Sequence, residues 1–273
     1  MKISLIQTNP QTDREQNLKI TRQLMEDAID NDKPDLLVLP EYFEYYGGTM
    51  AEKLASAEEA PGGSAYAMAQ SIAKTHGVYV HAGSLMERIA DDDKRIYNST
   101  VVFDRSGNEV ARYRKIHMFD ITAPDGTSWK ESATVKPGQD VVVYEVDGIK
   151  VGCAICYDIR FAELFLALAR LDVDVIILPA AFALQTGKDH WEVLSRARAI
   201  ETQTYVVACG QWGTHWNNGE ARHTYGHSLV CDPWGHVVAQ ASDGVGYVTA
   251  RLDPAVIARA RAAIPMKNHR RLA

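Results

Sequence analysis

Cys156 is the residue of this chain best placed to act as a nucleophile. It lies in the stretch VGCAICYDIRFAEL, between an apolar run at 149–155 that favours a buried strand and a helical pattern that starts at Phe161. A thiol at a strand-to-helix bend projects outward beside the backbone N–H groups of the following turn. Those N–H groups can lower the pKa of the thiol and stabilise a developing oxyanion. The alternative is a buried structural cysteine, the commoner role of a cysteine in an apolar run.

Two charged residues at strand ends could complete such a site. Glu41 follows a buried strand and Pro40 in LVLPEYFEYYG, where aromatic neighbours would desolvate its carboxylate and suit it to act as a general base. Lys115 follows a strand in ARYRKIHMFD, where its ammonium could stabilise negative charge on a thiolate or a carbonyl oxygen. Each also fits an ordinary solvated charge in a loop. Spacing alone does not distinguish Glu131, in the loop WKES, from other surface acids.

Cysteine and histidine residues raise two alternatives, redox chemistry and metal binding. Cys153 and Cys156 form a C-x-x-C pair, but residues three apart in a strand point to opposite faces, and thioredoxin-like pairs open a helix instead. We therefore assign Cys153 to packing. The remaining candidate ligands match no zinc spacing and are predicted to be hydrogen-bonding or loop residues: His215, His223, His227, His236 and Cys231. The sequence has no Walker loop, no G-x-G-x-x-G and no G-x-S-x-G motif.

Strands and helices that would position these residues alternate along the whole chain. Apolar runs predict strands at 2–8, 35–39, 78–85, 96–104, 109–114, 141–146, 149–155, 173–178, 205–209, 228–231, 236–239 and 246–252. Helical spacing predicts helices at 17–29, 64–75, 161–171 and 189–203, and a last helix that Asp253 caps and that ends at Ile264. Segment 115–138, which contains Pro124, lacks periodicity, and such a long irregular segment is usually functional or disordered.

The pattern of these elements predicts the fold class. Continuous apolar strands that alternate with helices indicate sheets buried on both faces. Because the second half repeats the order of the first, we predict an α/β fold in which two sheets pack together and helices cover each outer face. This is a four-layer αββα sandwich in a single domain, residues 1–265, followed by a polar and basic C-terminal tail, residues 266–273.

Composition argues against several classes of protein. The 273 residues are 46% apolar and 23% charged, with a net charge of −6 and no basic block, which argues against nucleic-acid binding. The start MKISLIQTNP is typical of a strand, so neither a signal peptide nor a membrane-spanning stretch is expected. All four cysteines lie in apolar, strand-like contexts, which predicts reduced thiols and a cytoplasmic location.

Three separate blocks of sequence resemble the nitrilase superfamily of carbon–nitrogen hydrolases. LVLPE, YRKIH and CYDIRF resemble the blocks that carry the family's Glu-Lys-Cys signature, here Glu41, Lys115 and Cys156, in the family's order. The resemblance extends over essentially the whole chain and implies an αββα sandwich. Within the superfamily, GTSWKESATVKPG and AAFALQTGKDHWEVL are most similar to the branch of ω-amidases and deaminated glutathione amidases. In that branch a second glutamate lies in the E-S-x-x-x-x-P-G loop, which corresponds to Glu131.

This resemblance implies hydrolysis of a small carboxylated amide, deaminated glutathione or the ω-amide of an α-keto acid, through a thioester on Cys156. It implies that Glu41 is the base and that Lys115 and the Tyr157 N–H stabilise the oxyanion. By analogy with the branch, Phe182 and Thr186 border the substrate pocket. A carboxylated substrate also needs a cation beyond Lys115, for which Arg160 is a candidate. No metal or organic cofactor is implied; the expected partners are the small-molecule amide and a second copy in a homodimer.

Other functions remain open at this point. A nitrilase or an N-carbamoyl hydrolase would use the same Glu-Lys-Cys triad, so the signature does not separate them from an amidase. A non-catalytic member of the same fold would be expected to have lost one of the three residues, and all three are present.

Overall fold

We describe the protein from a computed structural model of residues 1–122, 126 and 128–271. Residues 123–125 and 127 of the segment predicted to be irregular, including Pro124, and residues 272–273 of the predicted tail lie outside the described residues.

The first sheet has seven strands and is built around three parallel ones. β1 pairs with β2 and β2 with β3 in parallel, and antiparallel strands extend the sheet in the order β17-β1-β2-β3-β5-β4, with β6 against β5. The strands are β1 Lys2–Gln7, β2 Leu36–Val38, β3 Tyr79–His81, β4 Leu85–Ile89, β5 Asp92–Phe103, β6 Glu109–Arg114 and β17 Gly246–Arg251. β17 comes from the far end of the chain and closes this sheet against β1.

The second sheet repeats this plan with six strands in the order β16-β15-β12-β11-β10-β9. Its centre, β10 to β12, is again parallel, and β9, β15 and β16 are added antiparallel. The strands are β9 Val143–Val146, β10 Ile149–Cys153, β11 Val175–Ala180, β12 Tyr205–Gly210, β15 Leu229–Cys231 and β16 Val237–Gln240. The strand pair β9–β10 turns at Asp147 and Gly148, both in the left-handed region that a two-residue hairpin turn requires.

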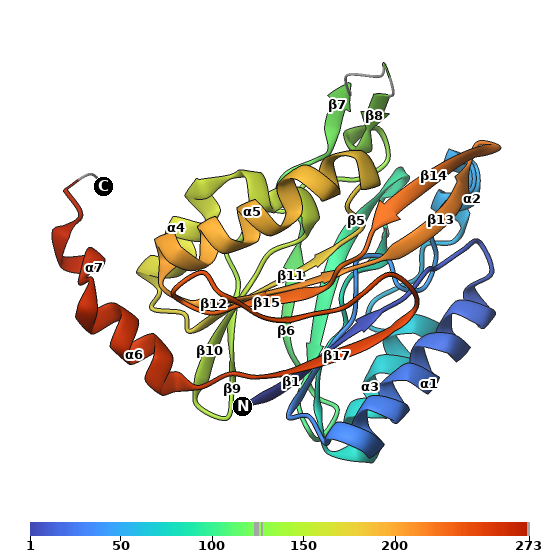
Figure 1. Cartoon of the computed structure of the whole chain (residues 1–273). Coiled ribbons are helices and arrows are strands. Elements are labelled where there is room, and N and C mark those ends of the chain that lie inside the picture. The colour runs from blue at the N-terminus through green and yellow to red at the C-terminus, as the bar shows by residue number, and fades with distance from the viewer. Residues whose placement is uncertain (123–125, 127, 272–273) are drawn as a thin grey trace.

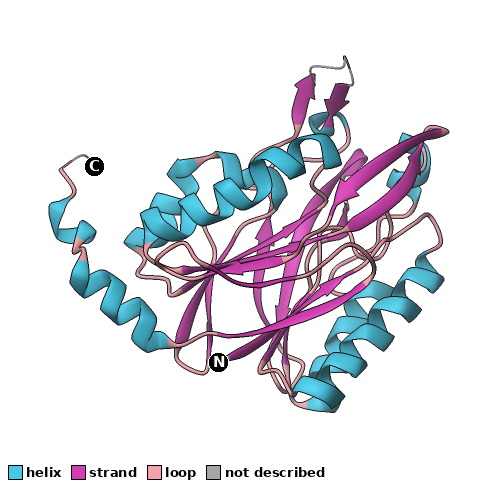
Figure 2. Ribbon diagram, viewed as in Figure 1, coloured by secondary structure: helices cyan, strands magenta, loops and turns pink. Residues whose placement is uncertain are grey.

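Helices cover the outer faces of the two sheets, as Figures 1 and 2 show. α1 Arg14–Asp32 and α3 Ser64–His76 pack on the first sheet, whereas α4 Ala162–Arg170 and α5 Leu184–Thr202 pack on the second. A shared apolar core lies between the sheets, with Leu5 and Val38 from one and Val175 and Ile177 from the other. The predicted four-layer αββα sandwich is confirmed.

Smaller elements lie at the ends of these layers. Between strands of the sheets the chain forms one short helix, α2 Met50–Ala55, and two 3₁₀ turns, η1 Glu131–Ala133 and η2 Cys156–Arg160. After β17 it forms two more helices, α6 Pro254–Ala263 and α7 Met266–His269. Asp253 caps α6 through the Ala255 N–H, as predicted. Two short hairpins, β7 Asp120–Thr122 with β8 Ser128–Lys130 and β13 Trp212–Asn217 with β14 Glu220–Tyr225, were not predicted.

Most predicted strands begin or end one or more residues away from their observed bounds, and two of these differences have a structural reason. The strand predicted at 78–85 is interrupted after His81, because Gly83 has φ +41 and a Cβ there would lie 2.0 Å from the Pro40 carbonyl oxygen. The strand predicted to stop before Pro179 continues to Ala180. The Ala180 carbonyl accepts from Gln211 on the β12 side and the Ile177 carbonyl accepts from Ala154 on the β10 side. Alternation points the Pro179 nitrogen toward the side that β10 has already left, so no strand bond is lost.

Among the described residues, no helix is both long enough and apolar enough to cross a bilayer. The same residues contain no group of three or more His, Cys, Asp and Glu side chains arranged to hold a metal ion.

Candidate active site

Glu41 is buried immediately after the end of β2, where Pro40 stops the strand. Its Oε1 accepts hydrogen bonds from the Asn98 amide at 2.7 Å and from Lys115 Nζ at 3.2 Å, and its Oε2 accepts the Ala181 N–H at 2.7 Å. Gln211 donates to the Glu41 backbone oxygen at 2.6 Å. Because Ala181 and Gln211 follow strands of the second sheet, both sheets fix this carboxylate.

Lys115 lies just beyond β6 and is 2% exposed. Besides Glu41, its ammonium donates to both carboxylate oxygens of Glu131, at 3.0 and 2.8 Å. Burial alone would lower the pKa of Lys115, but the charges of Glu131 and Glu41 outweigh it and hold that pKa well above its usual value. The ammonium is therefore a fixed positive charge between two carboxylates.

Glu131 begins the η1 turn, in the segment predicted to be irregular. Its Oε2 also accepts the Phe119 N–H at 2.7 Å. Burial opposes ionisation, yet the charges of Lys115 and Lys53 and the two sets of hydrogen bonds lower the pKa of Glu131. Glu131 is thus an ionised carboxylate that holds Lys115 in place.

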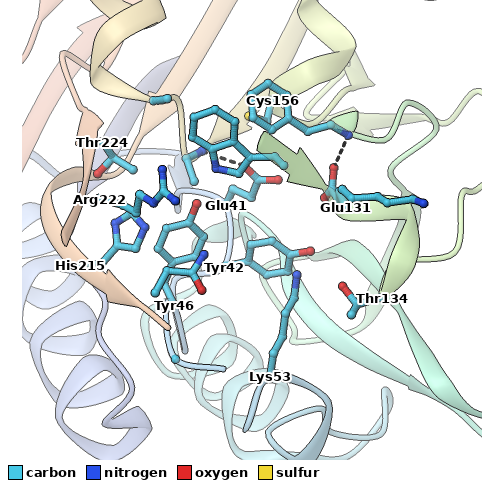
Figure 3. Close-up of a pocket in the computed structure, with 18 of the residues that line it drawn as sticks. Glu41, Tyr42, Tyr46, Lys53, Glu131, Thr134, Cys156, His215, Arg222 and Thr224 are labelled. Atoms are coloured by element: carbon cyan, nitrogen blue, oxygen red, sulfur yellow. Dashed lines mark hydrogen bonds between the residues drawn. The ribbon is translucent and has the colours of Figure 1, made fainter. Parts of the chain in front are cut away.

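Cys156 opens η2 directly after β10, with φ +47, a left-handed conformation that is rare for a residue with a side chain. Its side chain lines the same cavity as Glu41 and Lys115 (Figure 3). We expected the turn to lower the pKa of this thiol, but burial and the adjacent Glu41 carboxylate together raise it well above its usual value, against Lys115 and the Ala181 N–H. The resting thiol keeps its proton and has a carboxylate beside it.

Asp158 holds the turn that carries Cys156. Its buried carboxylate accepts from the Ile155 N–H at 2.8 Å, from the Tyr113 hydroxyl at 2.7 Å and from the His117 N–H at 3.1 Å. The His117 ring lies 2.7 Å away through Nδ1 and stacks on Phe161 with centroids 3.7 Å apart. These contacts fix the bend from both sides.

The side chains of Glu41, Lys115, Glu131 and Cys156 line a cavity of about 470 Å³. Three of the four residues predicted to bind substrate line it, namely Tyr157, Phe182 and Thr186. Arg160 does not line it: its guanidinium lies over the Phe182 ring, 5.3 Å from the centroid, and close to His190. Cys153 does not line it either, and packs in the core between the sheets, while all four cysteines are unbonded.

Further cavity-lining residues were missed because they lie on elements that were not predicted. Lys53 is on α2, and His215 and Arg222 are on the β13–β14 hairpin (Figure 3). Burial, with His223 and Arg222 nearby, lowers the pKa of His215 to about 4, so its ring is neutral. The sequence held signals for both elements. Thr49 and Glu52 form a capping box, and Asn218-Gly219 is a hairpin turn.

Comparisons with known proteins agree with this fold. The family described as carbon-nitrogen hydrolase matches residues 2–262. Deaminated glutathione amidase of Synechocystis sp. is 39% identical over 257 residues, 93% of this chain and 92% of that protein. Among solved structures, the C. elegans NitFhit protein has a TM-score of 0.92 at 34% identity, covering 99% of this chain and 65% of that one.

A second solved structure is Saccharomyces cerevisiae Nit3, described as a member of branch 10 of the nitrilase superfamily. It has a TM-score of 0.88 at 32% identity and covers 100% of this chain and 97% of that one. The resemblance seen in the three motif blocks is confirmed. This chain belongs to the carbon-nitrogen hydrolase family of the nitrilase superfamily and is an amidohydrolase that acts on carbon–nitrogen bonds other than peptide bonds.

Proposed function

We propose that this protein uses Cys156 to hydrolyse a small amide that carries a carboxylate, deaminated glutathione or the ω-amide of an α-keto acid, and releases ammonia. One observation carries the proposal: Glu41, Lys115, Glu131 and Cys156 line the same cavity. The name of the Synechocystis relative, deaminated glutathione amidase, supports the choice of substrate.

In the first half of the reaction, Glu41 accepts the thiol proton as Cys156 Sγ attacks the amide carbonyl carbon. The carbonyl π electrons move to oxygen, and Lys115 with the Tyr157 N–H stabilises the resulting oxyanion. Glu41 then gives the proton to the amide nitrogen, and the C–N bond breaks. Ammonia departs, and the acyl group remains bound to Cys156 as a thioester. The raised pKa of the buried thiol supports this order, because proton removal and attack then occur together.

In the second half, Glu41 takes a proton from water as the water oxygen attacks the thioester carbonyl. The same donors stabilise the second oxyanion, the C–S bond breaks, and the proton returns to Sγ as the acid departs. Glu131 acts through Lys115: its bonds to Nζ and to the Phe119 N–H orient the ammonium toward the position of the oxyanion.

Replacement of the nucleophile tests this mechanism. Ammonia release is measured over a panel that includes deaminated glutathione and α-ketoglutaramate. Cys156→Ala should lower kcat by about 10⁴-fold or more while circular dichroism and the melting temperature remain close to wild type.

An acid quench of the wild-type enzyme during turnover of a slow amide should reveal the acyl mass on Cys156. The proposal would be contradicted by an adduct on another residue, by substantial turnover of Cys156→Ala, or by turnover of nitriles or carbamoyl compounds alone.

We also propose a cytoplasmic homodimer. The four unbonded cysteines support a reducing compartment. An exposed apolar patch on the outside of the second sheet supports self-association: Val193 and Ile200 on α5, and Trp234 in the adjoining turn.

A further inference from the structure

Several polar atoms of cavity-lining residues, among them His215 Nδ1 and Arg222 Nε, have no hydrogen-bond partner within the described part of the chain. Two such unpaired groups lie side by side, the Tyr42 hydroxyl and the Lys53 ammonium. The Tyr42 hydroxyl is buried, on a residue only 3% exposed, and is unbonded. Lys53 makes no ion pair there, and its Nζ lies over the Tyr42 ring, 5.0 Å from the centroid. Figure 3 shows the end of the Lys53 side chain next to the Tyr42 hydroxyl. A buried hydroxyl is costly to leave unpaired, and the partly buried ammonium beside it adds a positive charge, so a ligand with an anionic acceptor group fits this place.

The two carboxylates that line the cavity do not fill this role, because their oxygens are already bonded. Glu41 accepts from Asn98, Lys115 and the Ala181 N–H. Glu131 accepts twice from Lys115 and once from the Phe119 N–H. Burial lowers the pKa of Lys53, and the charge of Glu131 is the largest effect that opposes it. An added anion would stabilise the charged ammonium further.

The backbone places both donors firmly. Tyr42 directly follows Glu41 and has φ +49, an outlier for a bulky side chain, and its N–H donates to Ser84 Oγ at 3.1 Å. Lys53 lies on α2, whose first turn is fixed by the capping box of Thr49 and Glu52. Strained conformations held by their surroundings cluster at functional sites, so this one is consistent with a ligand-binding role for Tyr42.

We propose that Tyr42 Oη and Lys53 Nζ bind a carboxylate of the substrate and thereby select amides that carry an acid group. This inference rests on the proposed function, and it places the cation expected beyond Lys115 at Lys53 and not at Arg160. Arg222 is a weaker candidate because it already pairs with Glu220 at 2.7 Å. A substrate that ends in a methyl group would leave both donors unpaired, which is the situation in which polar pockets discriminate most strongly.

The test compares two amides of equal length, succinamate, which ends in a carboxylate, and butyramide, which ends in a methyl group. In Lys53→Met, kcat/KM for succinamate should fall about 10- to 100-fold, mainly through KM, because a charge-assisted contact is lost. The value for butyramide should stay within about twofold of wild type. Lys53→Arg should restore part of the preference, because the arginine keeps the positive charge.

Two more variants separate a binding role from a structural one. Tyr42→Phe should lower kcat/KM for succinamate about 5-fold without lowering the melting temperature, because the hydroxyl has no protein partner to lose. Lys136→Met is the matched control: Lys136 Nζ also lies over a tyrosine ring, that of Tyr97 at 5.6 Å, but Lys136 does not line the cavity. Lys136→Met should leave the ratio of kcat/KM for succinamate to kcat/KM for butyramide unchanged.

Equal losses on both amides in Lys53→Met would overturn the inference, since Lys53 would then act on the catalytic groups. If the wild-type enzyme hydrolyses neither amide, the proposed function is in question, and binding decides the inference separately. Calorimetry with succinamate and the Cys156→Ala protein should then give a Kd that Cys156→Ala/Lys53→Met raises about 10- to 100-fold. An unchanged Kd would overturn it.

Discussion

Glu44 is a buried carboxyl group that lacks a counter-charge close enough to offset its burial. One oxygen accepts the Met86 N–H at 2.7 Å, and the other has no partner within the described residues. Burial raises the pKa of Glu44 to about 7 from its ordinary value of 4.5, against the hydrogen bond from Met86. Between pH 4.5 and 7 the folded protein therefore binds more protons than the unfolded chain, so its stability falls as pH rises through this window.

Replacing Glu44 by Gln removes this pH dependence. Ionised Glu44 costs on the order of 3 kcal/mol, so Glu44→Gln should unfold at higher urea concentration than wild type at pH 8. The difference should shrink toward pH 4.5, where the wild-type group is protonated. Urea unfolding of both proteins from pH 4.5 to 8 measures it. A difference that does not change with pH would show that Glu44 is not the titrating group.

Glu87 supplies a control of opposite sign. Burial alone would raise the pKa of Glu87, but hydrogen bonds from Arg114 and Ser99 and the charge of Arg112 lower it. Its ionised form stabilises the fold above pH 4.5, and this stability is lost as pH falls. Glu87→Gln should therefore be less stable than wild type at pH 8, with a deficit that narrows in acid.

For single residues, the sequence pointed to candidate reacting groups but did not predict their burial or their hydrogen-bond partners. Glu41, Lys115 and Cys156 were singled out because each follows a recognisable strand, and Glu131 was singled out only through the resemblance. The pKa of Cys156 was predicted in the wrong direction, because it depends on burial by a second sheet that local sequence does not describe. The partners of Glu44 are equally remote in the chain.

Among the elements, the β13–β14 hairpin and the loop before α2 meet at the cavity. The Gly48 N–H donates to the Trp216 carbonyl at 2.7 Å, and the Asn218 N–H donates to the Gly48 carbonyl at 3.2 Å. Gly47 has φ +93, and a Cβ there would lie 2.5 Å from the Trp216 carbonyl oxygen. The hairpin that carries Arg222 and His215 is therefore positioned by a glycine.

Gly47→Ala should displace the hairpin and disturb the pocket. The new Cβ would clash with the Trp216 backbone, and an alanine at this positive φ is strained. We therefore expect a loss of about 2 to 4 kcal/mol in stability. A shift of the cavity wall should lower kcat/KM by about tenfold or more. Thermal unfolding and amide kinetics measure both effects.

Gly219, at the tip of the same hairpin, gives the comparison. It has φ +79, but a Cβ there would meet nothing within 4 Å. Gly219→Ala should cost only the strain, about 1 to 2 kcal/mol, and leave kcat/KM unchanged. If both alanines lowered kcat/KM equally, contact between loop and hairpin would not be what shapes the pocket.

Buried elements were predictable, whereas those that face the cavity or solvent were not. Buried strands and amphipathic helices have strong periodicity, so all strands of the two sheets except β4 and all four covering helices were predicted, with errors at their ends. β13 and β14 contain polar and aromatic residues that face a cavity and solvent, so they lack the alternation of a half-buried strand. The Asn218-Gly219 turn was the stronger signal and was overlooked.

For the whole molecule, the site exists only because the two sheets pack together. Glu41 and Lys115 follow strands of the first sheet, and Cys156 follows β10 of the second. Across the interface, Ala181 donates to Glu41 and the Tyr113 hydroxyl donates to Asp158. Packing of the two sheets therefore brings together the proposed catalytic groups, which lie far apart in the sequence.

The outer face of the second sheet provides the last prediction, on the proposed homodimer. Val193 and Ile200 lie seven residues apart, which places them on the same side of α5, and are 65% and 48% exposed. Ile200 adjoins the turn that carries Trp234, which is 50% exposed, and Arg196 donates to the Gly235 carbonyl at 2.7 Å. In a two-fold dimer, one substitution on this face acts in both subunits.

Val193→Asp should raise the dimer dissociation constant on the order of 100-fold, because two carboxylates would be brought into an apolar contact. Light scattering after size exclusion should give twice the chain mass for wild type and approach the chain mass for the variant on dilution. Val110→Asp, at a 43% exposed valine on β6 of the other sheet, should stay dimeric. A wild-type protein that is monomeric at every concentration would refute the homodimer, whereas a dimeric Val193→Asp would place the interface on another face.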